Sequence, residues 1–260
     1  MRVLFGTVLS FAVLIVLCNA AFYARRARRL RAVAACDVPE RLGLFDAAVG
    51  FVGECAAAAV AVLLIPIGWC MRPCRPSAGA RGPLVLVHGW GVNRGCFWLL
   101  RRRLLRDGWS SVCCFNYAPF DATIENAAHR LRRVVDALAS EQPGVTLIGH
   151  GRGGLVLRYY LRRFPAPNAR RVVFLGTRHS VGNERESDAR LLSTLNAADR
   201  IPLQFDVIAI HSSFDALVPP ADGRYPGAFN VEISNVGHYA LLFSAKVYHL
   251  IAENLAAPLL

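Results

Sequence analysis

The stretch Val145–Leu157, VTLIGHGRGGLVL, decides the fold of this 260-residue chain. Its apolar start, Val145–Ile148, predicts a buried strand, and a glycine-rich turn separates this strand from a helix expected to begin at Leu155. Glycines flank the central residue, Gly151, as a turn requires where a helix and a strand approach closely. We therefore expect Gly151 at the apex of a strand–turn–helix unit.

The sequence around this unit alternates short β-branched runs with amphipathic stretches, which is typical of a parallel sheet flanked by helices. Expected strands cover residues 84–87, 112–116, 145–148, 171–175, 204–211 and 230–234, and expected helices cover 95–106, 124–140, 155–164 and 239–255. Residues 180–200 are polar and irregular, and we expect a small cap or loop there. Ligands of such sheets bind beyond the carboxyl ends of the strands, so site residues are expected at those positions.

Three further motifs follow expected strands. The first is a glycine-containing turn, HGWG, at His88–Gly91. Asp215 lies in HSSFDALVPP, and His238 lies in NVGHYALL before the last helix. A carboxylate that accepts a hydrogen bond from a histidine fixes its tautomer, which is the interpretation we favour for this pair. The alternatives are a solvated loop aspartate and a surface or helix-capping histidine.

These motifs together resemble the α/β-hydrolase family, and most of all bacterial membrane-anchored lipase- or esterase-like proteins. GHGRGG resembles the GHSxGG nucleophile elbow, and the order of elbow, acid and histidine is that of the family. The resemblance covers roughly residues 84–255. It implies an α/β-hydrolase fold in which Asp215 is the acid, His238 is the base, and the backbone N–H groups of Trp90 and Arg152 form the oxyanion hole.

Two departures from the family pattern bear on function. Gly151 stands where the family has its nucleophilic serine, so the nucleophile position is vacant. Arg178, in the GTRH segment, stands where the similar lipase segment has a proline. We therefore expect a lipase- or esterase-like protein whose catalysis is impaired or lost, with a lipid or a small acyl ester as its ligand.

Three classes of function stay open. The His238–Asp215 pair could activate water directly in a residual ester hydrolase. A catalytically inactive protein could instead bind a lipid or a protein, as the serine-less neuroligins do within this family. The third class is a membrane-tethered structural domain that places its arginines on anionic lipid. The motifs favour the first two classes over the third, Gly151 favours the second, and the retained Asp215 and His238 favour the first.

The N-terminal part of the chain predicts membrane helices. Val3–Tyr23 carries no charged residue and is about 30 Å long as a helix, enough for a bilayer core. A cleaved signal peptide is the alternative. A cluster of arginines follows, at Arg25, Arg26, Arg28, Arg29 and Arg31.

A second apolar run, Leu42–Met71, predicts a second span, with a helix on the membrane or on the domain as the alternative. Glu54 within this run is costly unless it finds a partner. We expect residues 1–71 to form the membrane region, 72–82 a linker and 83–260 the α/β-hydrolase domain. Because the arginine cluster should stay inside, two spans place this domain outside the cytoplasmic membrane, and one span places it in the cytoplasm.

Other residues bear on cofactors and partners. His88, His150, His179 and His238 suggest a metal, but no acidic cluster accompanies them, so we expect neither a metal nor another cofactor. The net charge is +12, but nucleic acid is not an expected partner because no zinc-finger spacing or RNP-like motif is present. A protein partner is an open alternative. All eight cysteines lie at or before Cys114, and none lies at the nucleophile position. Cys70 and Cys74 could pair in an exported domain.

Overall fold

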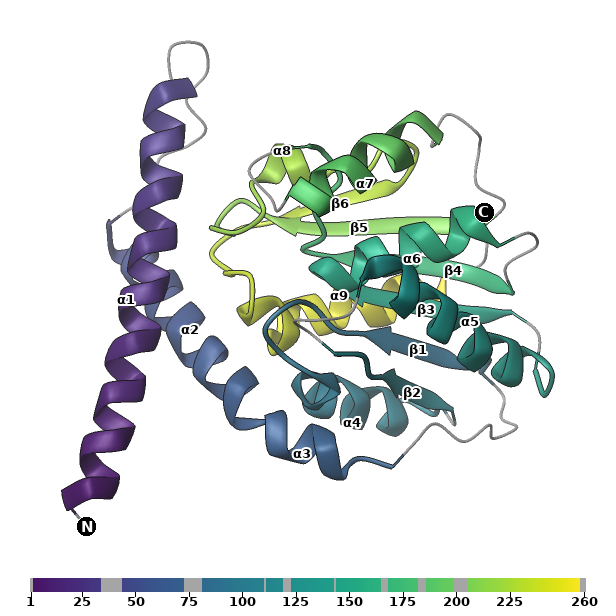
Figure 1. The fold of residues 1–260 in the computed structure, drawn as a ribbon, viewed down its shortest axis with the longest axis horizontal. Coiled ribbons are helices and arrows are strands. Elements are labelled where there is room, and N and C mark those ends of the chain that lie inside the picture. Colours follow the sequence, from purple (N-terminus) through teal and green to yellow (C-terminus); the bar gives the residue numbers. More distant parts are fainter. Residues whose placement is uncertain are drawn as a thin grey trace.

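The computed structural model describes residues 2–33, 44–72, 81–109, 111–118, 123–142, 144–164, 168–181, 186–198 and 205–257. A six-stranded parallel sheet has the order β2–β1–β3–β4–β5–β6 (Figure 1). The strands are β1 Leu84–Val87, β2 Val112–Phe115, β3 Val145–His150, β4 Ala169–Leu175, β5 Asp206–Ser212 and β6 Phe229–Ile233. The expected parallel sheet is therefore confirmed.

Helices cover both faces of this sheet. The core of one face contains Leu131 of α5 (Ile124–Ala139) and Leu157 of α6 (Arg152–Arg163). The other core contains Leu104 of α4 (Trp98–Arg106) and Ile251 of α9 (Ala245–Ala256). Every residue of β1, β2 and β3 is buried, as is usual for parallel strands covered on both sides.

The register of the strands brings their carboxyl ends to one edge. Val87 of β1 pairs with Gly149 of β3, His150 of β3 pairs with Leu175 of β4, and Leu175 pairs with Ile210 of β5. The turns that follow β1, β3, β4 and β5 therefore gather at the edge where ligands of such sheets bind.

Several predicted boundaries were wrong. Helix α6 begins at Arg152 rather than Leu155, because the turn at Gly151 leads directly into it. Residues 186–198, expected to be irregular, form helix α7 (Glu186–Ala198), which buries Leu192 and Leu195 at helical spacing among polar residues. Two expected helices are divided: 3₁₀ helix η1 (Arg94–Phe97) precedes α4, and 3₁₀ helix η2 (Ala240–Leu242) precedes α9. The short helix α8 (Pro220–Gly223) was not predicted.

The N-terminal helices lie beside the carboxyl edge of the sheet (Figure 1). They are α1 (Arg2–Val33), α2 (Leu44–Leu63) and α3 (Ile65–Cys70). The hydroxyl of Tyr23 in α1 donates to the carbonyl of Phe214 over 3.2 Å, after β5. At α3, the side-chain amide of Asn93 in the domain donates to the carbonyl of Ile65 over 2.9 Å. The N-terminal helices thus contact the domain at both ends.

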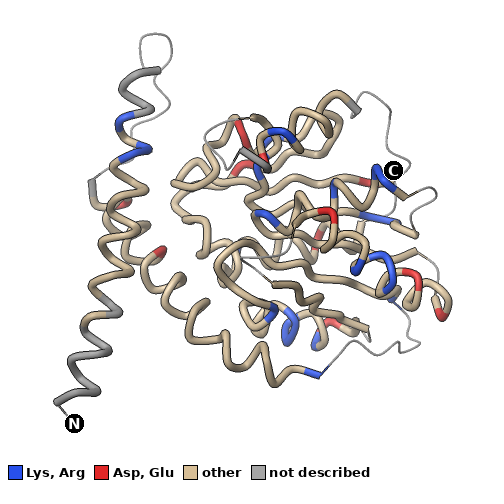
Figure 2. The backbone as a smooth tube through the Cα atoms, viewed as in Figure 1, with Lys and Arg blue, Asp and Glu red and all other residues tan. Residues whose placement is uncertain are grey.

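Among the described residues, one helical stretch is long and apolar enough to cross a membrane. It is Phe45–Cys70, with a mean hydropathy of 2.3 and 28% of its most apolar window buried. Figure 2 shows that α2 and α3 carry little charge. Large apolar side chains of this stretch are exposed, and they include Phe45, Val49, Val52, Val60, Leu63 and Trp69. Most of the expected linker, residues 73–80, lies outside the described part of the chain.

Candidate active site

The turn after β3 has the geometry of a nucleophile elbow. Gly151 lies between β3 and α6 with φ of 54° and ψ of −123°, and its N–H donates to the carbonyl of Leu175 over 2.9 Å. A positive φ of this kind favours glycine. At Gly154, a Cβ atom would lie 2.0 Å from Oγ1 of Thr177, so only glycine fits this contact. The elbow therefore keeps the close helix–strand approach although its central side chain is missing.

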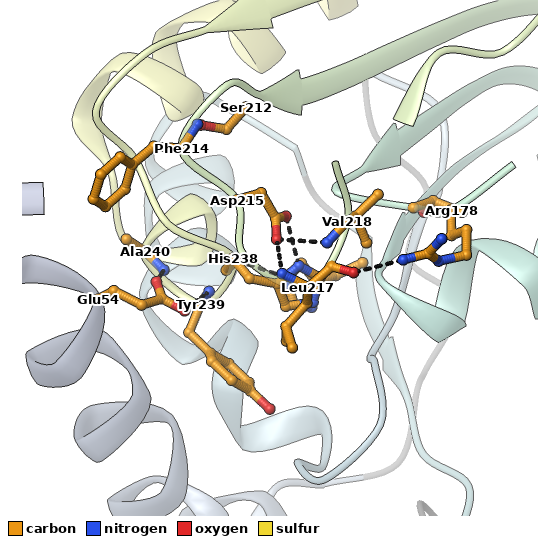
Figure 3. Close-up of polar contacts among 12 residues, drawn as sticks. Glu54, Arg178, Ser212, Phe214, Asp215, Leu217, Val218, His238, Tyr239 and Ala240 are labelled. Atoms are coloured by element: carbon orange, nitrogen blue, oxygen red, sulfur yellow. Dashed lines mark hydrogen bonds and ion pairs between the residues drawn. The ribbon is translucent and has the colours of Figure 1, made fainter. Parts of the chain in front are cut away.

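His238 and Asp215 form a buried pair (Figure 3). Nδ1 of His238 lies 2.7 Å from Oδ2 of Asp215, a carboxylate with 0% exposure. The other carboxylate oxygen, Oδ1, accepts from the N–H groups of Leu217 and Val218 over 2.8 Å each. Burial by itself lowers the pKa of His238, but the Asp215 charge and hydrogen bond raise it above its ordinary value overall.

The imidazole of His238 faces the vacant position. A Cβ atom on Gly151 would lie 3.0 Å from Nε2 and 3.4 Å from Cε1 of His238. The structure thus brings together the three positions that the sequence singled out, which come from the ends of three strands. The distance to Nε2 is tighter than most Cβ contacts, so a side chain at this position would need His238 to shift by a few tenths of an ångström.

The two expected oxyanion donors lie at the same edge. Trp90 follows β1 in the turn next to the elbow, and a Cβ on neighbouring Gly89 would lie 3.1 Å from the carbonyl oxygen of His150. Arg152 is the first residue of α6, and N–H groups of a first helical turn point toward the start of the helix. The Arg152 guanidinium forms an ion pair with Asp188 of α7, with Nε and Oδ2 3.1 Å apart, so α7 is fixed beside the elbow.

Three contacts around the pair were not predicted. Glu54 of α2 accepts from the N–H groups of Tyr239 and Ala240, over 2.9 and 3.0 Å. Nε2 of His150 lies 3.1 Å from the carbonyl oxygen of His238 and donates to it. Arg178 donates to the carbonyl of Leu217 over 2.8 Å and so braces the loop of the acid. An acid in the middle of an apolar run was the sequence signal for Glu54, whereas the sequence held no local signal for the other two contacts.

The histidines that suggested a metal have other surroundings. His150 and His238 lie with ring centroids 4.6 Å apart, whereas the His179 ring packs against Phe174 and Tyr225, with ring centroids 4.8 Å away in both cases. Burial lowers the pKa of His88 to about 4, in agreement with its acceptor role toward the N–H of Tyr117. Within the described ranges, no group of three or more histidine, cysteine or acidic side chains is arranged to hold a metal.

The sheet order, the elbow and the pair after the later strands define the α/β-hydrolase fold. Solved structures with this fold include lipase BlEst2 from Bacillus licheniformis, with a TM-score of 0.57 and 15% identity, over 72% of this chain and 96% of that one. Esterase RhEst1 from Rhodococcus sp. ECU1013 gives a TM-score of 0.56 and 15% identity, over 70% and 93% of the two chains. The chain therefore resembles lipases and esterases in its fold.

Sequence comparison finds a more limited likeness. A putative chloroplastic methylesterase 14 of Arabidopsis thaliana is 31% identical over 106 residues, which are 38% of this chain and 30% of that protein. The match thus spans less than a third of the length of the methylesterase. No family profile matches the chain.

Proposed function

We propose that this chain is a membrane-associated protein of the ester-hydrolase type, with a lipid or a small acyl ester as its ligand and with impaired or lost catalysis. One observation carries the proposal. The Asp215–His238 pair faces the apex of an elbow at which Gly151 offers no nucleophile. The retained pair favours an ester-binding site, and the missing side chain argues against the covalent mechanism.

The residues that are present limit the chemistry. His238, oriented by Asp215, can accept a proton from water, and the N–H groups of Trp90 and Arg152 are the expected donors to an oxyanion. No acyl-enzyme can form at Gly151. An oxyanion hole and binding alone retain roughly 10³–10⁴-fold catalysis over water in serine hydrolases stripped of their triad. We therefore expect turnover of the unmodified protein to be weak at most.

A second function, ligand binding without catalysis, is favoured by the position of the imidazole. His238 lies so close to Gly151 that a side-chain Cβ there would be only 3.0 Å from Nε2. The pair and the elbow are thus packed so closely that a side chain at position 151 would require His238 to shift by a few tenths of an ångström. Such a site retains the polar groups expected to bind an ester carbonyl and lacks a group that attacks it.

Activity against short-chain and long-chain p-nitrophenyl esters tests the proposal. We expect Gly151→Ser to gain ester hydrolysis over the unmodified protein, because the new hydroxyl lies next to His238. Gly151→Ala is the matched control, since it adds the Cβ without the hydroxyl and should gain nothing. Turnover of the unmodified protein as fast as that of Gly151→Ser would refute the vacant-nucleophile interpretation. No gain in Gly151→Ser, with ester binding retained, would favour the binding function.

The membrane is a further part of the proposal. The charge-free sequence Val3–Tyr23 supports α1 as an anchor. The contact of Glu54 with the domain supports an α2 that lies along the domain, because a carboxylate bound to Tyr239 and Ala240 cannot lie among lipid tails. The outward apolar side chains of α2 and α3 would then rest against the bilayer, as in interfacial helices. We therefore propose α1 as the one span, and we place Phe45–Cys70, despite its span-like length and hydropathy, along the bilayer surface. The sequence alone favoured two spans.

The side of the membrane rests on two opposing observations. Arg26 of the arginine cluster donates to the carbonyl of Ser213, so cluster and domain lie on one side, and the positive-inside rule favours the cytoplasm. Cys113 forms a disulfide, which favours an oxidising compartment. Cys70 is a free thiol, so the Cys70–Cys74 pair that the sequence suggested does not form. The argument for an oxidising compartment rests on Cys113 alone. We propose the extracytoplasmic side of the cytoplasmic membrane, because the positive-inside rule is a statistical bias and a reducing cytosol opposes the disulfide.

A further inference from the structure

We propose that Glu54, which lies outside the hydrolase domain, is a positioning residue for His238, so that helix α2 is part of the active site. This inference rests on the proposed site, in which His238 is the base. It begins from a contact between distant parts of the chain: a carboxylate of the N-terminal region meets the loop that carries the histidine (Figure 3).

The contact uses both oxygens of the carboxylate. Oε1 of Glu54 accepts from the N–H of Tyr239 over 2.9 Å, and Oε2 accepts from the N–H of Ala240 over 3.0 Å. These N–H groups open the 3₁₀ helix η2, and such groups have no partner inside their own helix. Glu54 itself is only 2% exposed. A buried carboxylate is tolerated where donors satisfy it, as these two N–H groups do.

The backbone beside His238 is shaped for this approach. Gly237 precedes the histidine, and a Cβ atom on it would lie 2.3 Å from Oε2 of Glu54. Any other residue at 237 would push the carboxylate away. Glycine at this position and the acid at position 54 are therefore complementary parts of one contact.

His238 is consequently held from three directions. Its ring nitrogen Nδ1 is bound to Asp215, and its carbonyl oxygen accepts from His150 of β3. The two N–H groups that follow it in the chain are bound by Glu54. The first bond orients the ring, and the other two fix the backbone from which the ring extends. Loss of Glu54 would free the η2 side of this backbone and let the imidazole move relative to Gly151.

Glu54 also acts on the charge state of His238. Four groups influence this imidazole: Asp215 and Glu54 raise its pKa, whereas the positive charge of Arg178 lowers it, and His150 lies against its ring. Removal of the Glu54 charge therefore lowers the pKa of His238. A loosened Asp215 contact would act in the same direction.

The test is an NMR titration of the full-length protein in detergent micelles, with the His238 signal assigned by its loss in His238→Gln. We expect Glu54→Gln to lower the pKa of His238 and Glu54→Asp, which keeps the charge on a shorter side chain, to lower it less. Asp46→Asn is the matched control for charge, because Asp46 is an exposed acid in the first turn of the same helix. It should leave the titration unchanged.

Arg94→Ala is the control for helix docking. The Arg94 guanidinium donates to the carbonyls of Gly68 and Met71 over 2.7 and 2.6 Å, so it fastens the far end of the N-terminal helices and does not touch His238. Both Glu54→Gln and Arg94→Ala should lower the unfolding temperature. Only Glu54→Gln should shift the His238 titration. An unchanged or raised pKa of His238 in folded Glu54→Gln would overturn the proposal. If Glu54→Gln does not fold, the same result in Glu54→Asp would overturn it.

A kinetic arm uses the Gly151→Ser background. Adding Glu54→Gln should lower kcat with little change in KM, by up to about a hundredfold, the loss that a displacement of about 1 Å can cause. An equal kcat with and without Glu54 would contradict the positioning role. An inactive Gly151→Ser protein would instead favour ligand binding over ester hydrolysis as the function, and the titration would still decide the role of Glu54.

Discussion

At the scale of single residues, Gly151 decides what the site can do. Its φ of 54° is easily adopted by glycine, whereas a serine there would hold a strained backbone. Glycine at this position therefore leaves the elbow unstrained, and it offers no nucleophile. The imidazole of His238 lies near the space that a side chain would occupy, so a serine introduced at position 151 would also require a small shift of His238.

The cost of adding a side chain at position 151 can be measured as a loss of stability. We expect Gly151→Ser and Gly151→Ala to lower the free energy of unfolding by similar amounts, about 1–3 kcal/mol, because both add a Cβ at a positive φ. The difference between them isolates the hydroxyl and its contact with His238. Urea denaturation of the three proteins measures both quantities. A variant as stable as the original would show that the elbow is not strained.

The pH dependence of Gly151→Ser tests the Asp215–His238 pair. His238 must be neutral to accept a proton, and the Asp215 contact raises its pKa above the ordinary 6.5 despite burial. Ester hydrolysis should therefore rise with pH and level off only above that value. Asp215→Asn removes the charge, so in the same background it should move the inflection to lower pH and reduce the maximal rate. An inflection that Asp215→Asn leaves in place would show that another group controls the rate.

At the scale of elements, the first turn of α6 contains glycine because the helix packs closely on the residues after β4, although glycine is a poor helix former. Helix α6 begins directly at the turn, so Gly154 packs against Thr177, which follows β4. Helix α2 contains a glycine in the opposite situation: at Gly53, a Cβ atom would meet nothing within 4 Å. A comparison of Gly53 with Gly154 therefore separates the effect of side-chain packing on stability from the effect of helix propensity.

Alanine at these two positions should have effects of opposite sign. Gly53→Ala should raise the free energy of unfolding by up to about 1 kcal/mol, since alanine is the better helix former. Gly154→Ala gains the same propensity but places a Cβ 2.0 Å from Oγ1 of Thr177. We expect it to destabilise by about 1–3 kcal/mol, the usual range for overpacking. Denaturation of both variants gives the comparison, and equal shifts would mean that the helix–strand contact adapts freely.

At the scale of the whole molecule, the N-terminal helices and the domain act as one unit. Tyr23 and Arg26 of α1 contact the loop that carries Asp215, and Glu54 of α2 contacts the loop that carries His238. Both loops belong to the candidate site. If α1 is the anchor that we propose, the carboxyl edge of the sheet would face the membrane, which would suit a lipid or acyl-ester ligand.

Reporter fusions test the proposed topology. With α1 as the one span, alkaline phosphatase fused after Val33 and after Leu260 should be active in both proteins, because both positions lie on the extracytoplasmic side. A cytoplasmic reporter at the same positions should be inactive. Opposite results at the two positions would mean that α2 crosses the membrane and would contradict its docking on the domain. A cytoplasmic result at both positions would overturn the proposed side of the membrane. It would mean that the positive-inside rule predicts the side correctly and that the Cys113 disulfide does not.

The sequence by itself determined the parallel sheet, the elbow and the order of Gly151, Asp215 and His238. These features are encoded locally: β-branched runs predict buried strands, and glycines mark a turn that requires close approach. The carboxyl ends of parallel strands meet at one edge, so residues far apart in the chain could be assigned to one site before their distances were known.

Only the tertiary structure decided where the N-terminal helices lie and what surrounds His238. Hydropathy records that α2 is apolar, and it cannot distinguish burial in lipid from packing on a protein surface. The partners of Glu54 are the N–H groups of Tyr239 and Ala240, which carry no sequence signal because every residue except proline has this donor. The polar helix α7 was missed for a related reason, since its position depends on contacts such as the Arg152–Asp188 pair that form only after folding.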